Sequence, residues 1–273
     1  MPIIEKAWMR SANGRTEVFL TSGGREFSSS VSGEAAVENL EWIVGKEPDF
    51  KGFEQEVSSL PKEVSLAVTQ CLAKAQARTK LWRLFSQGTV NNLPMPAVVV
   101  LEKKDGIKEF FVFPKFAGGM NEALKTCNTA YRRFMEIPKN PKDDLKVFEI
   151  LSQIASDNNC SIGVDGEGDL LEGAKKAFGT FVLERGSVIQ LSDFSSVTKA
   201  LEAVIKIKES GKGIIVADSA DSLDSFSADF AVGVGAALFK GSLGKKEGII
   251  KFNRLLDIAL EIGEKVKWAE LPY

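Results

Sequence analysis

The sequence of 273 residues contains no histidine. Without an imidazole, the chain cannot activate a serine or cysteine nucleophile in the Ser–His or Cys–His manner, and it has no imidazole ligand for a metal. Cysteine is scarce as well, because Cys71, Cys127 and Cys160 lie far apart and show no C-x-x-C spacing. We therefore expect reduced, structural thiols in a cytoplasmic protein.

Neither sign of charge is in excess, and long apolar runs are missing. The chain has 35 lysines and arginines against 37 aspartates and glutamates, so its net charge gives no reason to expect nucleic acid or an anionic membrane as a partner. No apolar run reaches the roughly 18 residues of a membrane span, and the first residues lack the basic-then-apolar pattern of a secretory leader. What is present, 44% hydrophobic and 26% charged residues, suits a globular core in one large or two ordinary domains.

The N-terminal part of the chain predicts an antiparallel meander. Strands are expected at 3–10 and 17–21, joined through N-G at 13–14, which is a strong hairpin signal. The S-G-G run at 22–24 then turns the chain into a third strand at 25–30. Helices are expected next, so this part reads as an α+β unit.

Two helices are predicted after the meander, one at 34–44 and a long one at 62–86, separated by a polar stretch at 48–61. The long helix has apolar residues at helical spacing. Its predicted buried face consists of Val64, Val68, Leu72, Ala75 and Leu81.

The rest of the chain alternates strands with helices, which indicates β/α units with parallel strands after an antiparallel start. Six strands are predicted, at 94–100, 109–114, 161–165, 188–191, 213–217 and 237–240. The stretch 180–184 is left open as a seventh strand. Helices are predicted at 121–136, 144–156, 171–178 and 224–234, and from a cap at Ser195 or Ser196 to residue 211.

A long amphipathic helix closes the chain. Its apolar face is predicted from Ile249, Phe252, Leu256 and Ala259, and Gly263 is expected at its C-terminal stop.

Three short motifs in this C-terminal third resemble the end of the enolases. The chain reads S-A-D-F-A-V-G at 227–233, F-K-G at 239–241 and K-F-N-R-L-L at 251–256. Enolases read I-A-D-L-V-V-G, I-K-T-G and K-Y-N-Q-L-L in the same order and at nearly the same spacing. P-M-P-A-V-V-V at 94–100 and E-F-F-V-F-P at 109–114 likewise resemble two enolase strands, P-V-P-A-F-N-V-I and Q-E-F-M-I-L-P.

The resemblance implies a fold, a domain division and an assembly. It implies an enolase-like N-terminal α+β domain over residues 1–92, followed by a (β/α) TIM-type barrel over residues 93–273. An enolase barrel has eight strands, whereas about six are predicted here, and the shortfall lies between Asp165 and Gln190. We therefore expect a reduced barrel with exposed strand edges, and such edges favour dimerisation, which enolases also show.

The resemblance also implies which catalytic positions have changed. The enolase base is a lysine in L-L-L-K-V-N-Q-I-G-S-V-T, and the chain reads V-I-Q-L-S-D-F-S-S-V-T at 188–198. Gln190 therefore stands at the base position, where an amide cannot accept the proton. Lys240 and Glu109 match two retained active-site positions. Alternatively, Lys240 is a solvated strand-end residue or a partner for Asp165, and Glu109 only satisfies its neighbours.

The magnesium and substrate positions are depleted in the same comparison. G-V-D at 163–165 resembles the enolase G-M-D, which makes Asp165 a retained metal ligand, and a second alignment places 165–169 against the later G-D-D. Asp165, Glu167 and Asp169 could hold a small cation, or they belong to a polar loop after a strand. The enolase S-H-R-S becomes A-D-S-A at 217–220, so Asp218 and Ser219 replace a histidine and an arginine. An acid there opposes a phosphorylated carboxylate.

Four aspartates gather between 218 and 229. They suggest either a metal site or, as we expect, residues that cap and solvate a loop before a helix N-terminus. The run consists of Asp218, Asp221, Asp224 and Asp229.

Three functions are consistent with these residues. The first is an enolase-family homologue that has lost phosphopyruvate hydratase activity and acts as a cytoplasmic binding or scaffolding protein, possessing weak or no magnesium binding. The second is a diverged magnesium-dependent lyase or isomerase acting on a carboxylate, with Lys240 as base and Asp165 as a ligand. The third is a homodimer in which two chains pool half-sites.

Overall fold

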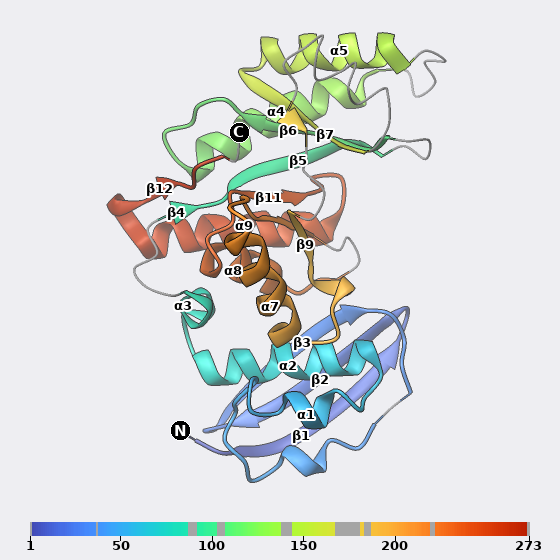
Figure 1. The fold of residues 1–273 in the computed structure, drawn as a ribbon, viewed down its shortest axis with the longest axis vertical. Coiled ribbons are helices and arrows are strands. Elements are labelled where there is room, and N and C mark those ends of the chain that lie inside the picture. The colour runs from blue at the N-terminus through green and yellow to red at the C-terminus, as the bar shows by residue number, and fades with distance from the viewer. Residues whose placement is uncertain are drawn as a thin grey trace.

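The computed structural model describes residues 2–36, 38–86, 92–102, 107–137, 144–166, 181–182, 187–218 and 222–271. The meander and the helix that follows it lie at one end of the molecule, and the sheet of the second part lies beyond them (Figure 1). Helices α4 (Met120–Met135) and α5 (Asp144–Asp157) lie at the opposite end.

The predicted meander is confirmed. Strands β1 (Ile4–Ala12), β2 (Arg15–Ser22) and β3 (Arg25–Ser32) form an antiparallel sheet in the order β1-β2-β3. Asn13 and Gly14 both have positive φ, 56° and 74°, as the tight turn of a two-residue hairpin requires. The N-G dipeptide therefore sets the register of β1 and β2.

One face of this sheet packs on α2 (Lys62–Ala77). Burial along β2 alternates residue by residue, as period-2 geometry requires when one face is covered. The apolar face predicted for the long helix is confirmed, because all five of its residues are buried: Val64, Val68, Leu72, Ala75 and Leu81.

The helix predicted at 34–44 is wrong. Within this segment the described residues form only a 3₁₀ turn, η1 (Glu41–Ile43). The backbone N–H of Ala35 donates to Ser11 Oγ at 3.0 Å, and that of Glu38 to Met9 Sδ at 3.2 Å. These N–H groups bond to side chains of β1, which competes with a helical ladder.

The helix predicted at 62–86 is broken in two. Helix α2 ends at Ala77, Arg78 takes a positive φ of 60°, and a short α3 (Leu81–Phe85) follows. The break lets α3 pack on α8 (Phe226–Gly233), and this approach is close. A Cβ on Gly233 would lie 2.4 Å from the Trp82 carbonyl oxygen, so the contact depends on a residue without a side chain.

Among the described residues, the second part contains a seven-stranded sheet of order β8-β7-β6-β5-β11-β10-β9. Its strands are β5 (Met95–Glu102), β6 (Ile107–Pro114), β7 (Cys160–Gly166), β8 (Phe181–Val182), β9 (Val188–Gln190), β10 (Ile215–Ala217) and β11 (Leu238–Gly241). Strand β6 is antiparallel to β5 and β7, and the other pairs are parallel. The six predicted strands are present, and the segment left open as a seventh contributes the two-residue β8.

Helices cover this sheet where the sequence predicts them. Helices α4 and α5 agree with the predictions within two residues, and α7 (Val197–Glu209) begins after Ser196, whose Oγ accepts from Lys199 N at 3.1 Å. Ser196 is therefore the cap of the two candidates. The predicted helix at 171–178 lies outside the described residues. A short parallel pair, β4 (Asn92–Leu93) and β12 (Lys267–Trp268), lies beside the sheet.

The predicted face of the last helix needs correction. In α9 (Lys246–Ile262), Phe252 is buried as expected, but Ile249 is 43% exposed and Leu256 and Ala259 are half-buried. The buried face consists of Gly248, Lys251, Phe252, Leu255 and Ile258. The rotation brings Lys251 inward, which apolar periodicity cannot anticipate. Gly263 ends the helix with a φ of 77°, as expected.

One face of the second sheet carries a compact apolar layer. Its buried residues come from four strands: Met95, Ala97, Phe111, Phe113, Ile215 and Leu238. Gly163 lies opposite Phe111 in register, and a Cβ there would be 2.0 Å from the ring. This layer fills the space beneath the charged residues described below.

The three cysteines lie in the interior of the protein. Cys71, Cys127 and Cys160 are buried and free, as predicted, and burial raises the pKa of Cys71 to about 12. No helix within the described residues combines the length and apolar character needed to cross a membrane.

A charged mouth on the sheet and an aspartate clamp at the junction

The mouth of the second sheet lies at the C-terminal ends of its parallel strands. Gln190, Ala217, Lys240 and Ala97 stand side by side in register across β9, β10, β11 and β5. Leu238, two residues before Lys240, belongs to the apolar layer. Because residues i and i+2 of a strand share a face, Lys240 and Gln190 lie on the same side of the sheet as that layer.

Two carboxylates complete the mouth. Glu109 and Asp165 are register partners on β6 and β7, and both follow the alternation that puts Phe111 and Gly163 on the inner face. We call Glu109, Asp165, Gln190 and Lys240 the mouth. Lys240, Glu109 and Asp165 are in contact at one end of the sheet, and Gln190 lies in the same register row as Lys240.

Lys240 is held by both carboxylates. Its Nζ lies 2.5 Å from Glu109 Oε2 and 2.9 Å from Asp165 Oδ2. The lysine side chain is 7% exposed, and the carboxylates are 28% and 24% exposed. Of the roles weighed from the sequence, the structure places Lys240 as a partner of Asp165. An ammonium that donates to Asp165 and forms an ion pair with Glu109 has no free lone pair with which to remove a proton.

Gln190, which the sequence comparison predicts at the base position, has a hydrogen-bonding role in the structure. It is half-buried, and its Nε2 donates to Ser192 Oγ at 3.0 Å. It lies two strands from Lys240 in the same register row. The amide therefore contributes a hydrogen-bonding group to the mouth and no titratable one.

The mouth does not fit an enolase-type magnesium site. Such an ion needs several oxygen ligands, but Asp165 already accepts from Lys240. Over the residues that the structure describes, no three Asp, Glu, His or Cys side chains come together in a way that could hold a metal. Glu167 and Asp169 lie outside the described residues.

Asp218 faces a buried lysine. Its Oδ1 lies 2.5 Å from Lys251 Nζ, and both side chains are nearly inaccessible, at 3% and 2% exposed. Lys251 also donates to the Ser222 carbonyl at 2.7 Å. The negative charge of Asp218 is thus neutralised within the fold. Ser219 lies outside the described residues.

The expectation that the aspartates cap and solvate a loop is wrong in its solvation for the described members, which are buried. Asp224, however, does accept from the first backbone N–H of α8. Asp229 is 2% exposed and is bound by Arg254 through two hydrogen bonds of 2.8 and 2.7 Å. Burial raises the pKa of Asp229 despite this partner. Asp221 lies outside the described residues. Basic residues on inward helix positions, such as Lys251 and Arg254, are the signal that could have predicted buried partners.

Asp224 clamps the two parts of the molecule. Its Oδ2 accepts from Lys74 Nζ at 2.6 Å, Ser29 Oγ at 2.9 Å and Ser30 N at 3.1 Å, and its Oδ1 accepts from Phe226 N at 2.9 Å. We call Asp224 and these partners the junction. Burial acts to raise the pKa of Asp224, but Lys74 and the other donors outweigh it and lower the pKa.

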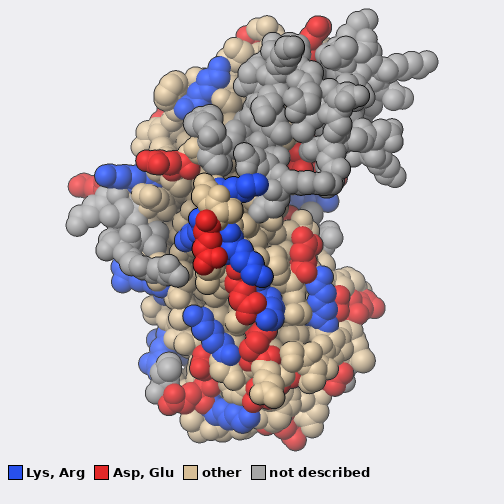
Figure 2. Space-filling view, in the orientation of Figure 1, with Lys and Arg blue, Asp and Glu red and all other residues tan. Residues whose placement is uncertain are grey.

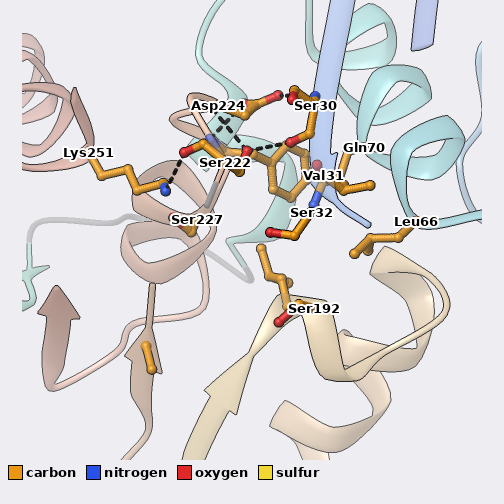
Figure 3. A pocket seen from close by; sticks show the side chains of 13 residues that line it. Ser30, Val31, Ser32, Leu66, Gln70, Ser192, Ser222, Asp224, Ser227 and Lys251 are labelled. Atoms are coloured by element: carbon orange, nitrogen blue, oxygen red, sulfur yellow. Dashed lines mark hydrogen bonds between the residues drawn. The ribbon is translucent and has the colours of Figure 1, made fainter. Parts of the chain in front are cut away.

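A small cavity lies beside the junction (Figure 3). Residues of β3, α2, α8 and α9 line it, together with Ser192 after β9 and Ala217 at the end of β10. Its volume is about 20 Å³, which is room for about one water molecule. The meander therefore packs against the strand ends where an open β/α fold would receive a ligand.

Charges on the visible surface are mixed. On the face shown in Figure 2, basic and acidic side chains alternate over the centre of the molecule and do not separate by sign. This distribution agrees with the near-zero net charge. It offers no strong single-sign field on that face for a polyanion.

A comparison with known protein families matches the C-terminal part of the chain. The fold and the mouth define a mixed α/β protein with an antiparallel meander and a seven-stranded mixed sheet. A family model for the enolase C-terminal TIM barrel domain matches residues 169–271. The matched residues are less than half of the chain, and over them the chain is similar to this enolase domain.

The similarity to individual enolases is partial. Enolase 2 of Lactococcus lactis subsp. lactis (strain IL1403) is 36% identical over 103 residues, which is 37% of this chain and 23% of that protein. Enolase 1 of Methylococcus capsulatus is 34% identical over 83 residues, 30% of this chain and 20% of that protein. The enolase of Desulfotalea psychrophila is 38% identical over 78 residues, which is 28% of this chain and 18% of that protein. The chain thus spans less than a quarter of the length of the curated relatives it matches.

Proposed function

We propose that this chain is an enolase-family homologue whose phosphopyruvate hydratase site is depleted, and that it acts as a non-catalytic binding or scaffolding protein of the cytoplasm. The observation that carries the proposal is the enclosure of Lys240 between Glu109 and Asp165. A family active-site lysine has become part of an ion cluster that is satisfied without a substrate.

The missing base supports the same conclusion. Hydratase chemistry removes a weakly acidic proton next to a carboxylate, so it needs a group that can accept that proton. Gln190 cannot, and the Lys240 Nζ is engaged by the Glu109 and Asp165 carboxylates. Neither side chain offers a free group that could take up the substrate proton.

The small size of the cavity beside the junction also supports the loss of hydratase activity. A cavity of about 20 Å³ at the ends of β9 and β10 does not admit a phosphorylated three-carbon acid, since pockets for such ligands are at least several times larger. Asp218, which replaces a histidine, already pairs with Lys251.

We further propose that the sheet is a reduced enolase barrel and that a second copy covers its edges. Strands β8 and β9 are the terminal strands of the described sheet, and unpaired strand edges require cover. The division into residues 1–92 and 93–273 belongs to this proposal, and light scattering at micromolar concentration tests the homodimer. A monomer would also dismiss the pooling of half-sites between two chains.

A coupled assay with 2-phosphoglycerate and magnesium tests the proposed function. We expect no turnover above a no-protein control, and we expect none from Lys240→Ala. An authentic enolase serves as the positive control. Turnover by the wild-type chain that Lys240→Ala abolishes would overturn the proposal, because it would show that the lysine works as a base.

One observation favours the alternative of a diverged magnesium-dependent lyase. Lys240 lies at a strand end beside an acid, which is the position from which a base reaches a substrate in this class of fold. This function requires magnesium to raise the melting temperature and Asp165→Ala to remove that rise. An unchanged melting curve counts against it.

A further inference from the structure

The mouth contains its own cation. Two carboxylates that are register partners on adjacent strands, Glu109 and Asp165, share one ammonium at 2.5 and 2.9 Å. We propose that Lys240 acts as a built-in cation that replaces a divalent ion between these carboxylates, so that the mouth excludes magnesium and becomes a divalent-cation site only when the lysine charge is removed.

Electrostatics make the three groups mutually dependent. Glu109 and Asp165 would repel each other if both were ionised without a cation, and this repulsion is strong because each is about three-quarters buried. Lys240 is even less exposed, at 7%, and a buried ammonium needs a counter-charge. The cluster satisfies both requirements within one sheet.

The position of the Lys240 ammonium is determined by the backbone of β11. Lys240 is in register with Ala217 on β10 and Ala97 on β5, and its carbonyl accepts from Asp218 N at 2.8 Å. Backbone pairing on both sides therefore fixes the point from which the side chain starts. A lysine side chain is flexible in general, but here the backbone from which it extends is fixed by hydrogen bonds on both sides.

A metal ion would have to displace this ammonium. Carboxylate oxygens bind magnesium or manganese at about 2.1 Å, which leaves no room for Nζ at its observed position. On the inner face the apolar layer with Leu238 and Phe111 lies next to the mouth, and moving an ammonium into that layer would bury an unpaired charge. Wild-type protein is therefore expected to reject the divalent ion.

This inference rests on the proposed function, which includes the loss of metal chemistry. Its test, however, measures cation binding and not turnover. We would titrate Mn²⁺ into wild-type protein, Lys240→Met, Lys240→Arg and the double variant Lys240→Met/Asp165→Asn, following binding by calorimetry and electron paramagnetic resonance. Lys246→Met is the matched control, because it removes the charge of an exposed lysine at the start of α9.

We expect Lys240→Met to bind one Mn²⁺ at least about tenfold more tightly than wild-type protein, Lys240→Arg and Lys246→Met. The added Asp165→Asn substitution should remove this gain. We also expect Mn²⁺ to raise the melting temperature of Lys240→Met alone. A folded Lys240→Met that gains no Mn²⁺ affinity would overturn the inference.

A comparison without any Lys240 variant covers the case in which Lys240→Met does not fold. Wild-type protein and Asp165→Asn should bind Mn²⁺ equally weakly. If wild-type protein binds Mn²⁺ and Asp165→Asn loses about tenfold or more of that affinity, the carboxylate is a metal ligand and the inference is wrong. Turnover of 2-phosphoglycerate would overturn the proposed function, whereas Mn²⁺ binding that depends on Asp165 would overturn this inference.

Discussion

The mouth and the junction both pair a lysine with carboxylate, but they differ in what their charges hold together. At the mouth, Lys240, Glu109 and Asp165 come from three strands of one sheet, and the carboxylates are about a quarter exposed. At the junction, the 7% exposed Asp224 receives donors from β3, α2 and the start of α8. Burial and the number of donors make the junction carboxylate the more important of the two for stability.

The largest expected effect is at the junction. Asp224→Ala should lower the free energy of unfolding by about 3–5 kcal/mol, because it leaves several donors without their acceptor between two packed surfaces. At the mouth, Asp165→Asn should cost about 1 kcal/mol or less, since the site is partly exposed and an amide oxygen still accepts from Lys240. Urea unfolding measures both changes.

The control for this comparison is Asp257→Ala, which removes an exposed aspartate on α9 and should change stability by at most about 0.5 kcal/mol. If Asp165→Asn costs as much as Asp224→Ala, the distinction between the two regions is wrong. The mouth would then be a principal structural element in its own right.

Acid titration sharpens the same comparison. The folded-state pKa of Asp224 is lowered from its ordinary value, so its ionised form contributes stability above an unfolded pKa of about 3.9, and this contribution is lost as pH falls through the folded pKa. Asp229 acts in the opposite sense, because its folded pKa is raised and its ionisation costs stability. We expect Asp224→Asn to flatten the decline in unfolding free energy below about pH 5.

Urea midpoints at a series of pH values measure this slope, with Asp257→Asn as the control that keeps the wild-type profile. An Asp224→Asn variant whose acid decline matches that of wild-type protein would show that other carboxylates set the slope.

The sequence predicts most of the fold because its local signals agree with the tertiary structure. The N-G turn fixes the first hairpin, and alternating strands and helices place β5, β6, β7, β9, β10 and β11. The failed helix prediction at 34–44 has a long-range cause. Around Ala35 and Glu38, side-chain acceptors on β1 take backbone N–H groups that a helix would need, and no local pattern encodes that long-range partner.

The sequence likewise predicts some residues of the candidate site and misses others. Family motifs single out Lys240, Glu109 and Asp165, and strand register explains why they meet. The buried pairs of Lys251 with Asp218 and of Arg254 with Asp229 were missed. Apolar periodicity ignores a basic residue on an inward helix position, although such a residue must find an acid once it is buried.

A smaller effect is expected in the apolar layer beneath the mouth. Gly163→Ala should lower the free energy of unfolding by about 1–3 kcal/mol, because the new methyl group would overlap the Phe111 ring. Phe111→Leu makes room for it, so the double variant should cost less than the sum of the two single variants. Additive costs in urea unfolding would show that the two residues do not share this space.

A further modest effect decides between two neighbouring serines. Ser196→Ala should cost about 1–2 kcal/mol, because Ser196 Oγ accepts from Lys199 N and also contacts the Glu54 carboxylate at 2.8 Å. Ser195→Ala, the matched control from the same S-S pair, should cost less than about 0.5 kcal/mol. Since Glu54 lies in α1 (Glu54–Val57), Ser196 also links α7 to the N-terminal part. An equal loss in both variants would mean that the cap is shared and that this second link contributes no stability.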